Sequence, residues 1–595
     1  MSLQPDPTPT GTAGAQSAAV ELLEAVRADL SGLTLPLELP GAAAARESMR
    51  ASLGQLEDYI LPRYRSLDAP LLAVVGGSTG AGKSTLVNAL VGHPVTRTGA
   101  IRPTTRQPIL LHHPADEAWF ASDRVLPTLS RVHGTLTGPA VPASAAGVTP
   151  DPSAMAQLVL LADGAVPAGI ALLDAPDVDS VSDDNRALAG QLLAAADLWI
   201  FVTTANRYAD AVPWRLLVDA ASRDILVAVV LDRVPPGAEA EVSEDLSRML
   251  QQEGLGGAEL FVIPEAGLDP LGMLPAPAAE PIRRWLAGIA ANAAGRAEIA
   301  RRTLDGTVRS LAVRVESVAR AALEQDEAAG QLADDVNAAY RDALATIRAA
   351  SSDGSLLRGE VLARWQDFVG TGEFFRALES GIGRFRDRIG AFFRGQPPPA
   401  VRVEEAIETG LAAVVVDQGA QAAEDADQRW RSDPAGRALL GSDDLSGASE
   451  GFGEEVAAEI RAWQLDVLAL IRSEGADKRA QARWMSFGVN GLGVLLMVVV
   501  FSVTGGLTGV EVGIAGGTAV VGQKLLEAVF GEDAVRRLAE EVRAGLERRC
   551  ERLLERESRR FLDRLAPGTD HGGTGARVET LERRAKELAA LGRAG

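Results

Sequence analysis

The sequence predicts an α/β protein: a domain with a mostly parallel sheet, followed by a long α-helical region that carries an apolar hairpin. Three observations predict this order. A glycine-rich loop at residues 77–84 directly follows an apolar segment, short apolar runs alternate with helical patterns up to about residue 289, and the strand pattern disappears beyond residue 290. This alternation is typical of a parallel sheet covered by helices, and a length of 595 residues allows several domains.

The first 66 residues are expected to form a lead and a set of helices. Residues 1–17 are rich in Pro, Thr and Gly and lack a basic start followed by an apolar run, so we expect a disordered lead and no secretory signal. Residues 18–66 have helical periodicity, which Pro36 and Pro40 interrupt. We expect these helices to pack on the later helical region.

The glycine-rich loop fits the phosphate-binding pattern G-x-x-x-x-G-K-[ST]. An apolar strand precedes it at residues 71–75 and a helix begins at its end, so backbone N–H groups and the helix dipole face an anion. Lys83 is expected to pair with the β- and γ-phosphates and Ser84 to ligate Mg²⁺. The pattern predicts a nucleoside triphosphate site formed by Gly77, Ser78, Thr79, Gly80, Ala81, Gly82, Lys83, Ser84 and Thr85.

A carboxylate and a threonine are expected to complete the Mg²⁺ site. Asp174 ends an apolar strand at residues 170–174, where a triphosphatase needs an acid for the metal. The loop at residues 98–109 contains threonines that can close over Mg²⁺ and the γ-phosphate. We expect Lys83 and Ser84 to act in catalysis, and Ser84 and Asp174 to hold the metal, in each case together with Thr104 or Thr105 of this loop.

The remaining elements of the α/β domain follow from short apolar runs. Further strands are expected at residues 109–112, 198–203, 225–232 and 260–263, and an insertion loop at residues 138–152. The predicted domains are residues 1–17, 18–66, 67–292 (nucleotide domain), 293–483 (helical region), 484–523 (apolar hairpin), 524–567 (returning helix) and 568–595 (tail helix).

The apolar hairpin consists of two uncharged stretches. Residues 484–510 are long enough to cross a hydrocarbon layer, and residues 512–523 are rich in small residues that allow close helix packing. Basic residues flank the segment on both sides, which favours two cytoplasmic ends. The alternative is a hairpin buried in a soluble helical bundle, because the second stretch is short and Glu511 is costly in lipid.

Charge and cysteine content exclude several kinds of site. A net charge of -21 argues against a nucleic-acid partner, since phosphate backbones require a basic surface. The single cysteine, Cys550, excludes intramolecular disulfides and thiolate clusters. The five histidines show no helical metal-ligand spacing.

The motifs together resemble those of bacterial dynamin-like proteins. Residues 105–111 resemble the T-R-x-P-apolar signature of dynamin-like GTPases, and this resemblance favours Thr105 over Thr104 as the threonine that acts in catalysis and holds the metal. The phosphate loop, switch loop, D-x-P element, helical remainder and late apolar hairpin follow in the same order as in that family. The resemblance implies a GTP-binding head, a helical neck and stalk, and a membrane-inserting tip at the cytoplasmic face of the cell membrane. It also implies membrane lipid as a partner, and a homo-oligomer or pairing with a related dynamin-like protein.

The sequence departs from the family at three places. Thr79 and Gly80 replace the Gln-Ser pair that dynamins use in hydrolysis. Asp177 and Val178 replace the glycine of D-x-x-G and the water-orienting glutamine of small GTPases. Residues 232–235 replace the guanine-reading N-K-x-D, with a proline at the position of its Asp; Asp232 and Arg233 are candidates for the base pocket, although Asp232 could equally cap a turn.

These patterns leave three hypotheses for function. The leading one is a GTPase, slow without self-assembly, that binds GTP and Mg²⁺ and couples pairing of its heads to membrane binding or remodelling. The second is a soluble regulatory or assembly NTPase whose apolar hairpin is buried. The third is a scaffold that is ordered by nucleotide and does not hydrolyse it.

Overall fold

The computed structural model describes residues 10–95, 107–134, 157–179, 183–352, 399–474, 493–494, 496–497, 499–500, 526–527, 530–565 and 574–594. The chain divides into two compact units. We call residues 1–35, 40–324 and 572–595 the head unit, and residues 36–39 and 325–571 the helical unit. The domain boundaries predicted from the sequence stay a prediction.

The head unit is built around one sheet. Within the described residues the sheet has eight strands in the order β3-β4-β2-β5-β1-β6-β7-β8. Neighbouring strands are parallel except for β2 and β5, which are antiparallel. The predicted α/β class with a mostly parallel sheet is therefore confirmed. The strands are β1 (Leu71–Gly77), β2 (Ile109–His112), β3 (Ser130–His133), β4 (Gln157–Ala162), β5 (Ile170–Asp174), β6 (Leu198–Thr204), β7 (Leu226–Val234) and β8 (Glu259–Pro264).

Two strands were not predicted from the sequence. The edge strand β3 has mostly exposed or half-buried residues, so it lacks the apolar run that identifies a buried strand. Its neighbour β4 is apolar and pairs in parallel with both β2 and β3. The two strands extend the sheet on the side of β2.

Helices cover both faces of the sheet. Leu72 and Val74 of β1 belong to one apolar core, and Ala73 and Val75 belong to another, as the alternation of side chains along a strand requires. The second core contains residues of α4 and α9, and the first contains residues of α1, α3, α6, α7 and α8. The helices of this unit are α1 (Thr10–Ser31), α2 (Ala42–Gln55), the π-helix η1 (Leu56–Ile60), α3 (Leu61–Arg65), α4 (Lys83–Val91), the 3₁₀-helix η2 (Pro114–Asp116), α5 (Glu117–Phe120), α6 (Asp183–Ala194), α7 (Ala211–Ser222), α8 (Glu239–Gln252), α9 (Ala276–Ala291), the first part of α10 (Ala293–Ser352) and α21 (Thr574–Ala594).

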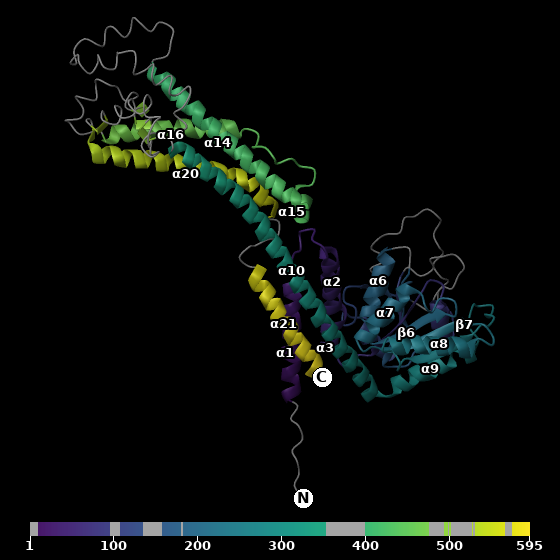
Figure 1. The fold of residues 1–595 in the computed structure, drawn as a ribbon. Helices are drawn as coiled ribbons and strands as arrows, with labels where there is room; N and C mark the ends of the chain where they lie inside the picture. Colours follow the sequence, from purple (N-terminus) through teal and green to yellow (C-terminus); the bar gives the residue numbers. More distant parts are fainter. Residues whose placement is uncertain are drawn as a thin grey trace, which may run out of the picture. The chain divides into compact units, whose positions relative to one another are not determined.

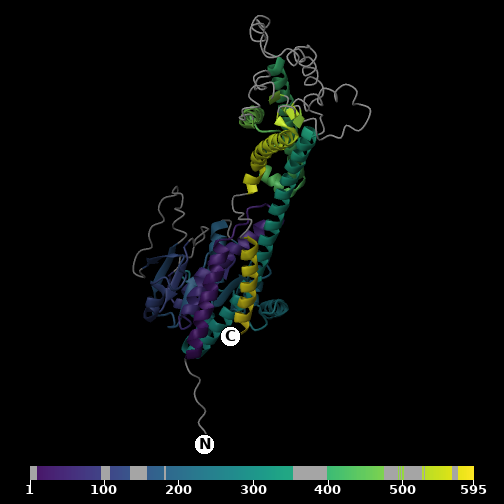
Figure 2. The same ribbon diagram turned by 90° about the vertical axis from the view of Figure 1, so that its left-hand side faces the viewer.

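Helices from the two ends of the chain meet in the head unit. In both views α1 and α21 lie beside the first part of α10 (Figures 1 and 2). Arg584 of α21 donates to the carbonyl oxygen of Ala25 over 2.8 Å and forms an ion pair with Asp29. Helix α1 begins at Thr10, inside the segment predicted to be a disordered lead, because the alanines that follow favour a helix.

The helical unit consists of long helices that share one core. They are the second part of α10, α14 (Pro399–Ser432), α15 (Pro434–Leu440), α16 (Phe452–Glu474) and α20 (Glu532–Leu565), and Figure 1 shows α14, α16 and α20 running together. The indole N–H of Trp430 donates to Leu332 and that of Trp463 to Val542, at 3.0 and 2.9 Å. The helical region predicted after the sheet is therefore present.

Only six residues of the predicted apolar hairpin lie among the described ones. They are helical, and five of them are almost fully buried in the core of the helical unit: Val494, Leu496, Met497, Val499 and Val500. Arg543 of α20 donates to the carbonyl oxygen of Val500 over 2.9 Å. Within the described part of the chain, no helix is both long and apolar enough to span a bilayer.

Candidate functional site

The phosphate loop connects the end of β1 to the start of α4. Gly77, Gly80 and Gly82 have positive φ values of 150°, 72° and 100°, a backbone conformation that side chains disfavour. A Cβ at Gly77 would collide with the carbonyl oxygen of Val202, and one at Gly82 would lie 2.5 Å from Asp232 Oδ2. The loop therefore requires glycine at these positions, as the predicted motif implies.

Lys83 lies under this loop and is 6% exposed. Its Nζ atom donates to the carbonyl oxygens of Gly77 and Ser78, at 3.0 Å each, and forms an ion pair with Asp177. Two carbonyl oxygens of the loop therefore hold the ammonium against the loop, and a carboxylate contacts it there. Phosphate oxygens are negatively charged, as this carboxylate is, and are also bound by ammonium groups.

Ser84 and Asp174 lie together at the carboxyl end of the sheet. The Ser84 hydroxyl donates to Asp174 Oδ2 over 2.8 Å, and the carboxyl group of Asp174 is fully buried. Its other oxygen, Oδ1, has no hydrogen-bond partner among the described residues. Burial raises the pKa of Asp174 to about 6, even though the Ser84 hydroxyl and the charge of Lys83 oppose this shift.

The residues present fit a Mg²⁺ ion. A buried carboxylate oxygen without a partner costs free energy, and a hydroxyl next to a carboxylate supplies the oxygen ligands that Mg²⁺ prefers. No cluster of three or more His, Cys, Asp or Glu suited to a metal occurs in the part of the chain that the structure describes. The third predicted ligand, Thr105, lies outside the described residues.

The predicted base-side residues lie next to the phosphate loop. Arg233, at the end of β7, donates to the carbonyl oxygen of Gly80, and its Nε atom lies 3.6 Å from Asp232 Oδ2. Asp232 is 7% exposed, and its Oδ1 has no partner within the described ranges. Burial raises the pKa of Asp232, against the opposing effects of the N–H and charge of Arg233. The structure thus brings Asp232 and Arg233 to the phosphate loop. Thr85, the last residue predicted for the nucleotide site, is half-buried on α4.

Two residues of the site were not found from the sequence. Asp179 Oδ1 accepts from the N–H and the hydroxyl of Thr79, at 2.6 and 2.8 Å. Arg207 donates to the other oxygen of Asp179 over 2.8 Å, to Asp210 over 2.8 Å and to the carbonyl oxygen of Thr79 over 3.0 Å. Burial alone would raise the pKa of Asp179, but the bonds from Thr79 and Arg207 outweigh it and lower that pKa. Asp179 follows β5 and Arg207 follows β6, both at the carboxyl edge of the sheet, and this position was the signal that could have identified them as site residues.

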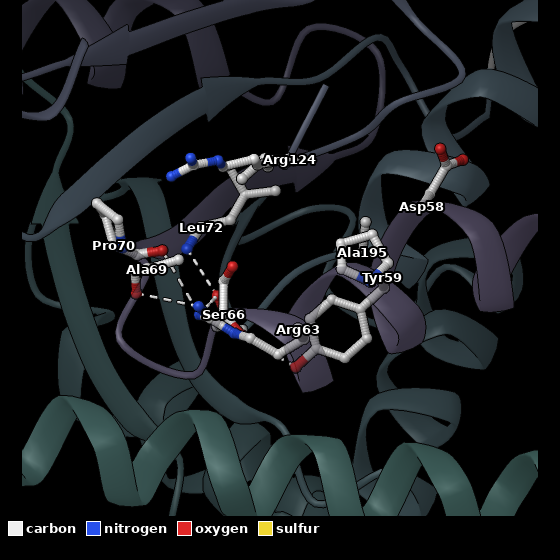
Figure 3. A pocket seen from close by; sticks show the side chains of 12 residues that line it. Asp58, Tyr59, Arg63, Ser66, Ala69, Pro70, Leu72, Arg124 and Ala195 are labelled. Carbon is white, nitrogen blue, oxygen red and sulfur yellow. Dashed lines mark hydrogen bonds and ion pairs between the residues drawn. The ribbon is translucent and has the colours of Figure 1, made fainter. Parts of the chain in front are cut away.

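A small cavity lies at the opposite edge of the sheet, near the first residues of β1 and β6. Figure 3 shows Arg63 beside Tyr59 and the carbonyl groups of Ala69 and Pro70. Asp197 accepts from Arg63, from the Tyr59 hydroxyl over 2.9 Å and from the Leu72 N–H over 2.8 Å. With a volume of 30 Å³ the cavity is too small for a nucleotide. The buried ion pair serves to fix α3 on the sheet.

A mostly parallel sheet with a glycine-rich phosphate loop, a buried lysine and a serine–carboxylate pair defines a P-loop fold of the kind that binds nucleoside triphosphates. The family model of the dynamin family matches residues 72–231. The predicted resemblance to dynamin-like proteins is therefore confirmed over residues 72–231.

The chain was also compared with curated proteins and with solved structures. No curated protein matches the chain. Two solved structures, both described as an oligomerised bacterial dynamin pair for long-range sensing and tethering of membranes, match at 11% identity. In one, the match covers 93% of this chain and 96% of the other with a TM-score of 0.37; in the second it covers 97% and 82% with a TM-score of 0.27. We base no conclusion on these two matches because both TM-scores are low.

Proposed function

We propose that the head unit binds GTP with Mg²⁺ and hydrolyses it. The observation that carries this proposal is the arrangement at the end of β1, where the buried Lys83 ammonium is bonded to the phosphate loop and Ser84 is bonded to the buried Asp174. The dynamin-family match over residues 72–231 supports guanine nucleotide as the ligand.

Each residue of the site has a role in this proposal. Backbone N–H groups of the phosphate loop receive the phosphate oxygens, and Lys83 exchanges Asp177 for the β- and γ-phosphates. Ser84 and Asp174 would hold Mg²⁺, with Thr105 as the proposed further ligand. When bound, the ion neutralises charge on the phosphates. Asp232 and Arg233 would line the base pocket, because Arg233 contacts the loop directly.

We further propose that nucleotide-dependent pairing of heads is coupled to binding or remodelling of a membrane at its cytoplasmic face. The apolar stretch at residues 484–510 and the dynamin-family domain support this part of the proposal. The partner would be membrane lipid, together with a second copy of the chain or a related dynamin-like protein.

A second candidate is supported by a specific observation. Val494, Met497 and Val500, from the first apolar stretch, are buried among the helices of the helical unit. A Cβ at Gly493 would lie 2.5 Å from Leu468 of α16, so this part of the stretch packs closely on that helix. A soluble regulatory or assembly NTPase with a buried hairpin would have this packing without any membrane.

Binding and turnover measurements test the proposed reaction. We expect purified protein with Mg²⁺ to bind a fluorescent GTP analogue more tightly than the ATP analogue and to release phosphate from GTP. Lys83→Ala should lower turnover by about 100-fold or more, because the phosphates lose a fixed positive charge. Lys586→Ala, the same change on the exposed face of α21, is the matched control. Absence of turnover in the wild type, at high protein concentration and with vesicles present, would contradict the proposal.

A further inference from the structure

Two carboxylates accept hydrogen bonds from groups of the phosphate loop that could bind phosphate oxygens. Asp177 is paired with Lys83, and Asp179 accepts from both the N–H and the hydroxyl of Thr79. The two acids lie two residues apart in the segment that follows β5. Their oxygens stand in for the oxygens of phosphate groups, which are bound by the same donors.

The Lys83 ammonium cannot pair with Asp177 and with the phosphates of a nucleotide at the same time, because two of its three N–H donors already bond to the Gly77 and Ser78 carbonyl oxygens. If Lys83 pairs with the β- and γ-phosphates, Asp177 must leave, and the short connection to Asp179 carries that residue away as well. The position next to the Thr79 N–H then becomes available to an oxygen of the γ-phosphate. The guanidinium of Arg207 lies beside the Thr79 N–H, since it donates to Asp179 over 2.8 Å and to the Thr79 carbonyl oxygen over 3.0 Å.

Arg207 is placed to make this exchange. It is 41% exposed, so its side chain can follow a new anion without breaking a packed core. Its contact with Thr79 and its pair with Asp210, at 2.8 Å, keep the guanidinium beside the loop when Asp179 leaves. The sequence has neither the Gln-Ser pair of dynamins in the loop nor a glutamine at Val178, so the reaction needs another group.

We propose that Arg207 is a catalytic residue that exchanges Asp179 for the γ-phosphate and stabilises negative charge during hydrolysis. This inference rests on the proposed GTPase function. Water oxygen forms a bond to the γ-phosphorus while the bond to the bridging oxygen breaks, and the electron pair of that bond passes to the diphosphate. A proton of the water passes to an oxygen of the transferred phosphoryl group, so that GDP and inorganic phosphate are the products. Arg207 keeps its proton and its charge throughout.

Single-turnover kinetics separate this role from nucleotide binding. Arg207→Ala should slow hydrolysis of bound GTP by about 10³-fold, the effect of an arginine supplied to a transferring phosphoryl group. The same variant should bind a non-hydrolysable GTP analogue within about threefold of the wild type, since this contact strengthens in the transition state. Arg207→Lys should recover only part of the rate, because an ammonium lacks the planar pair of donors. Arg284→Ala, an exposed arginine paired with Glu280 on α9, is the matched control.

Two further measurements distinguish catalysis from a structural latch. GDP with aluminium fluoride, which mimics the transferring phosphoryl group, should bind the wild type and should bind Arg207→Ala much more weakly. Asp179→Ala breaks the same ion pair from the other side; if the pair were only a latch, both variants would lose activity equally. Equal hydrolysis by the wild type and Arg207→Ala, or equal loss in the two variants, would overturn the inference while leaving the GTPase proposal intact. A wild type without turnover would overturn both.

Discussion

Asp174 combines a functional position with a cost in stability. Its carboxyl group is fully buried, one oxygen accepts from Ser84, and the other has no partner among the described residues. Such a group is stable when a cation lies against it and unfavourable when none does. The nucleotide-free head should therefore be less stable than a head with a neutral residue at this position.

Asp174→Asn should stabilise the nucleotide-free protein at pH 7.5. The pKa of Asp174 is raised by burial from 3.8 to about 6, so the folded state binds the proton more tightly than the unfolded state does. The stabilisation from this proton is present below about pH 4 and is lost as pH rises through 6, a difference of about 3 kcal/mol. Denaturant unfolding with a chelator should show a more stable variant at pH 7.5, and the two proteins should converge toward pH 4.

The same variant should lose Mg²⁺-dependent nucleotide binding, which separates the two effects of one side chain. A variant that is less stable than the wild type at pH 7.5 in chelator would contradict the assigned burial cost.

At the site, the sequence predicted what is contiguous and missed what folding brings together. The phosphate loop is one motif, and Asp174 ends an apolar strand, so both were found. Asp179 and Arg207 are 28 residues apart, and their contact depends on the neighbouring positions of the segments that follow β5 and β6. No pattern in the sequence gives that contact.

Among the elements, helix α10 makes an unusually close contact within the head unit. Gly306 lies against the backbone of Arg223, so that a Cβ at position 306 would collide with the Arg223 carbonyl oxygen. Near this contact, the Thr303 hydroxyl donates to the carbonyl oxygen of Asp197 over 3.4 Å, and Arg302 pairs with Asp224 over 2.6 Å. The glycine lets the helix approach the ends of α7 and β6.

Gly306→Ala should destabilise the protein by roughly 1–3 kcal/mol, because the added methyl group forces the helix away from Arg223. Gly330 provides a matched control on the same helix, since nothing lies within 4 Å of a Cβ there. Gly330→Ala should be neutral or stabilising by about 0.5–1 kcal/mol, the usual preference for alanine in a helix interior. Thermal unfolding of the two variants measures the difference, and equal midpoints would contradict the close contact.

The elements show why most of the fold could be predicted and part could not. Strands β1, β5, β6 and β7 are buried on both faces and form apolar runs. Strand β3 lies at the edge of the sheet with polar, exposed residues, so its pairing with β4 decides its structure and its composition does not.

At the scale of the whole molecule, the surroundings of the apolar stretches decide between the two proposed functions. The described residues of the first stretch are buried in the helical unit, and the remainder of residues 484–523 lies outside the described ranges. Membrane binding would therefore involve residues of the two stretches other than these buried ones, or a rearrangement that exposes them.

Ile514→Asp tests the second stretch directly. We expect the wild type with GTP to float with anionic vesicles and the variant to lose binding by about tenfold or more, because a carboxylate in the hydrocarbon layer costs about 2.5–3.5 kcal/mol. Leu465→Asp, at a position that is 66% exposed on α16, is the matched control. If the wild type stays with the soluble fraction under every nucleotide condition, the buried-hairpin GTPase is the better description.

The head unit takes part of its core from the far end of the polypeptide. Val578, Leu581, Ala585 and Leu588 of α21 are buried in the same apolar core as residues of α1 and the sheet. During translation, the nucleotide-binding sheet will leave the ribosome more than 300 residues before α21 does. A nascent head must therefore expose the apolar residues that α21 later covers while the helical unit is synthesised, and such exposed apolar surface favours binding by a chaperone.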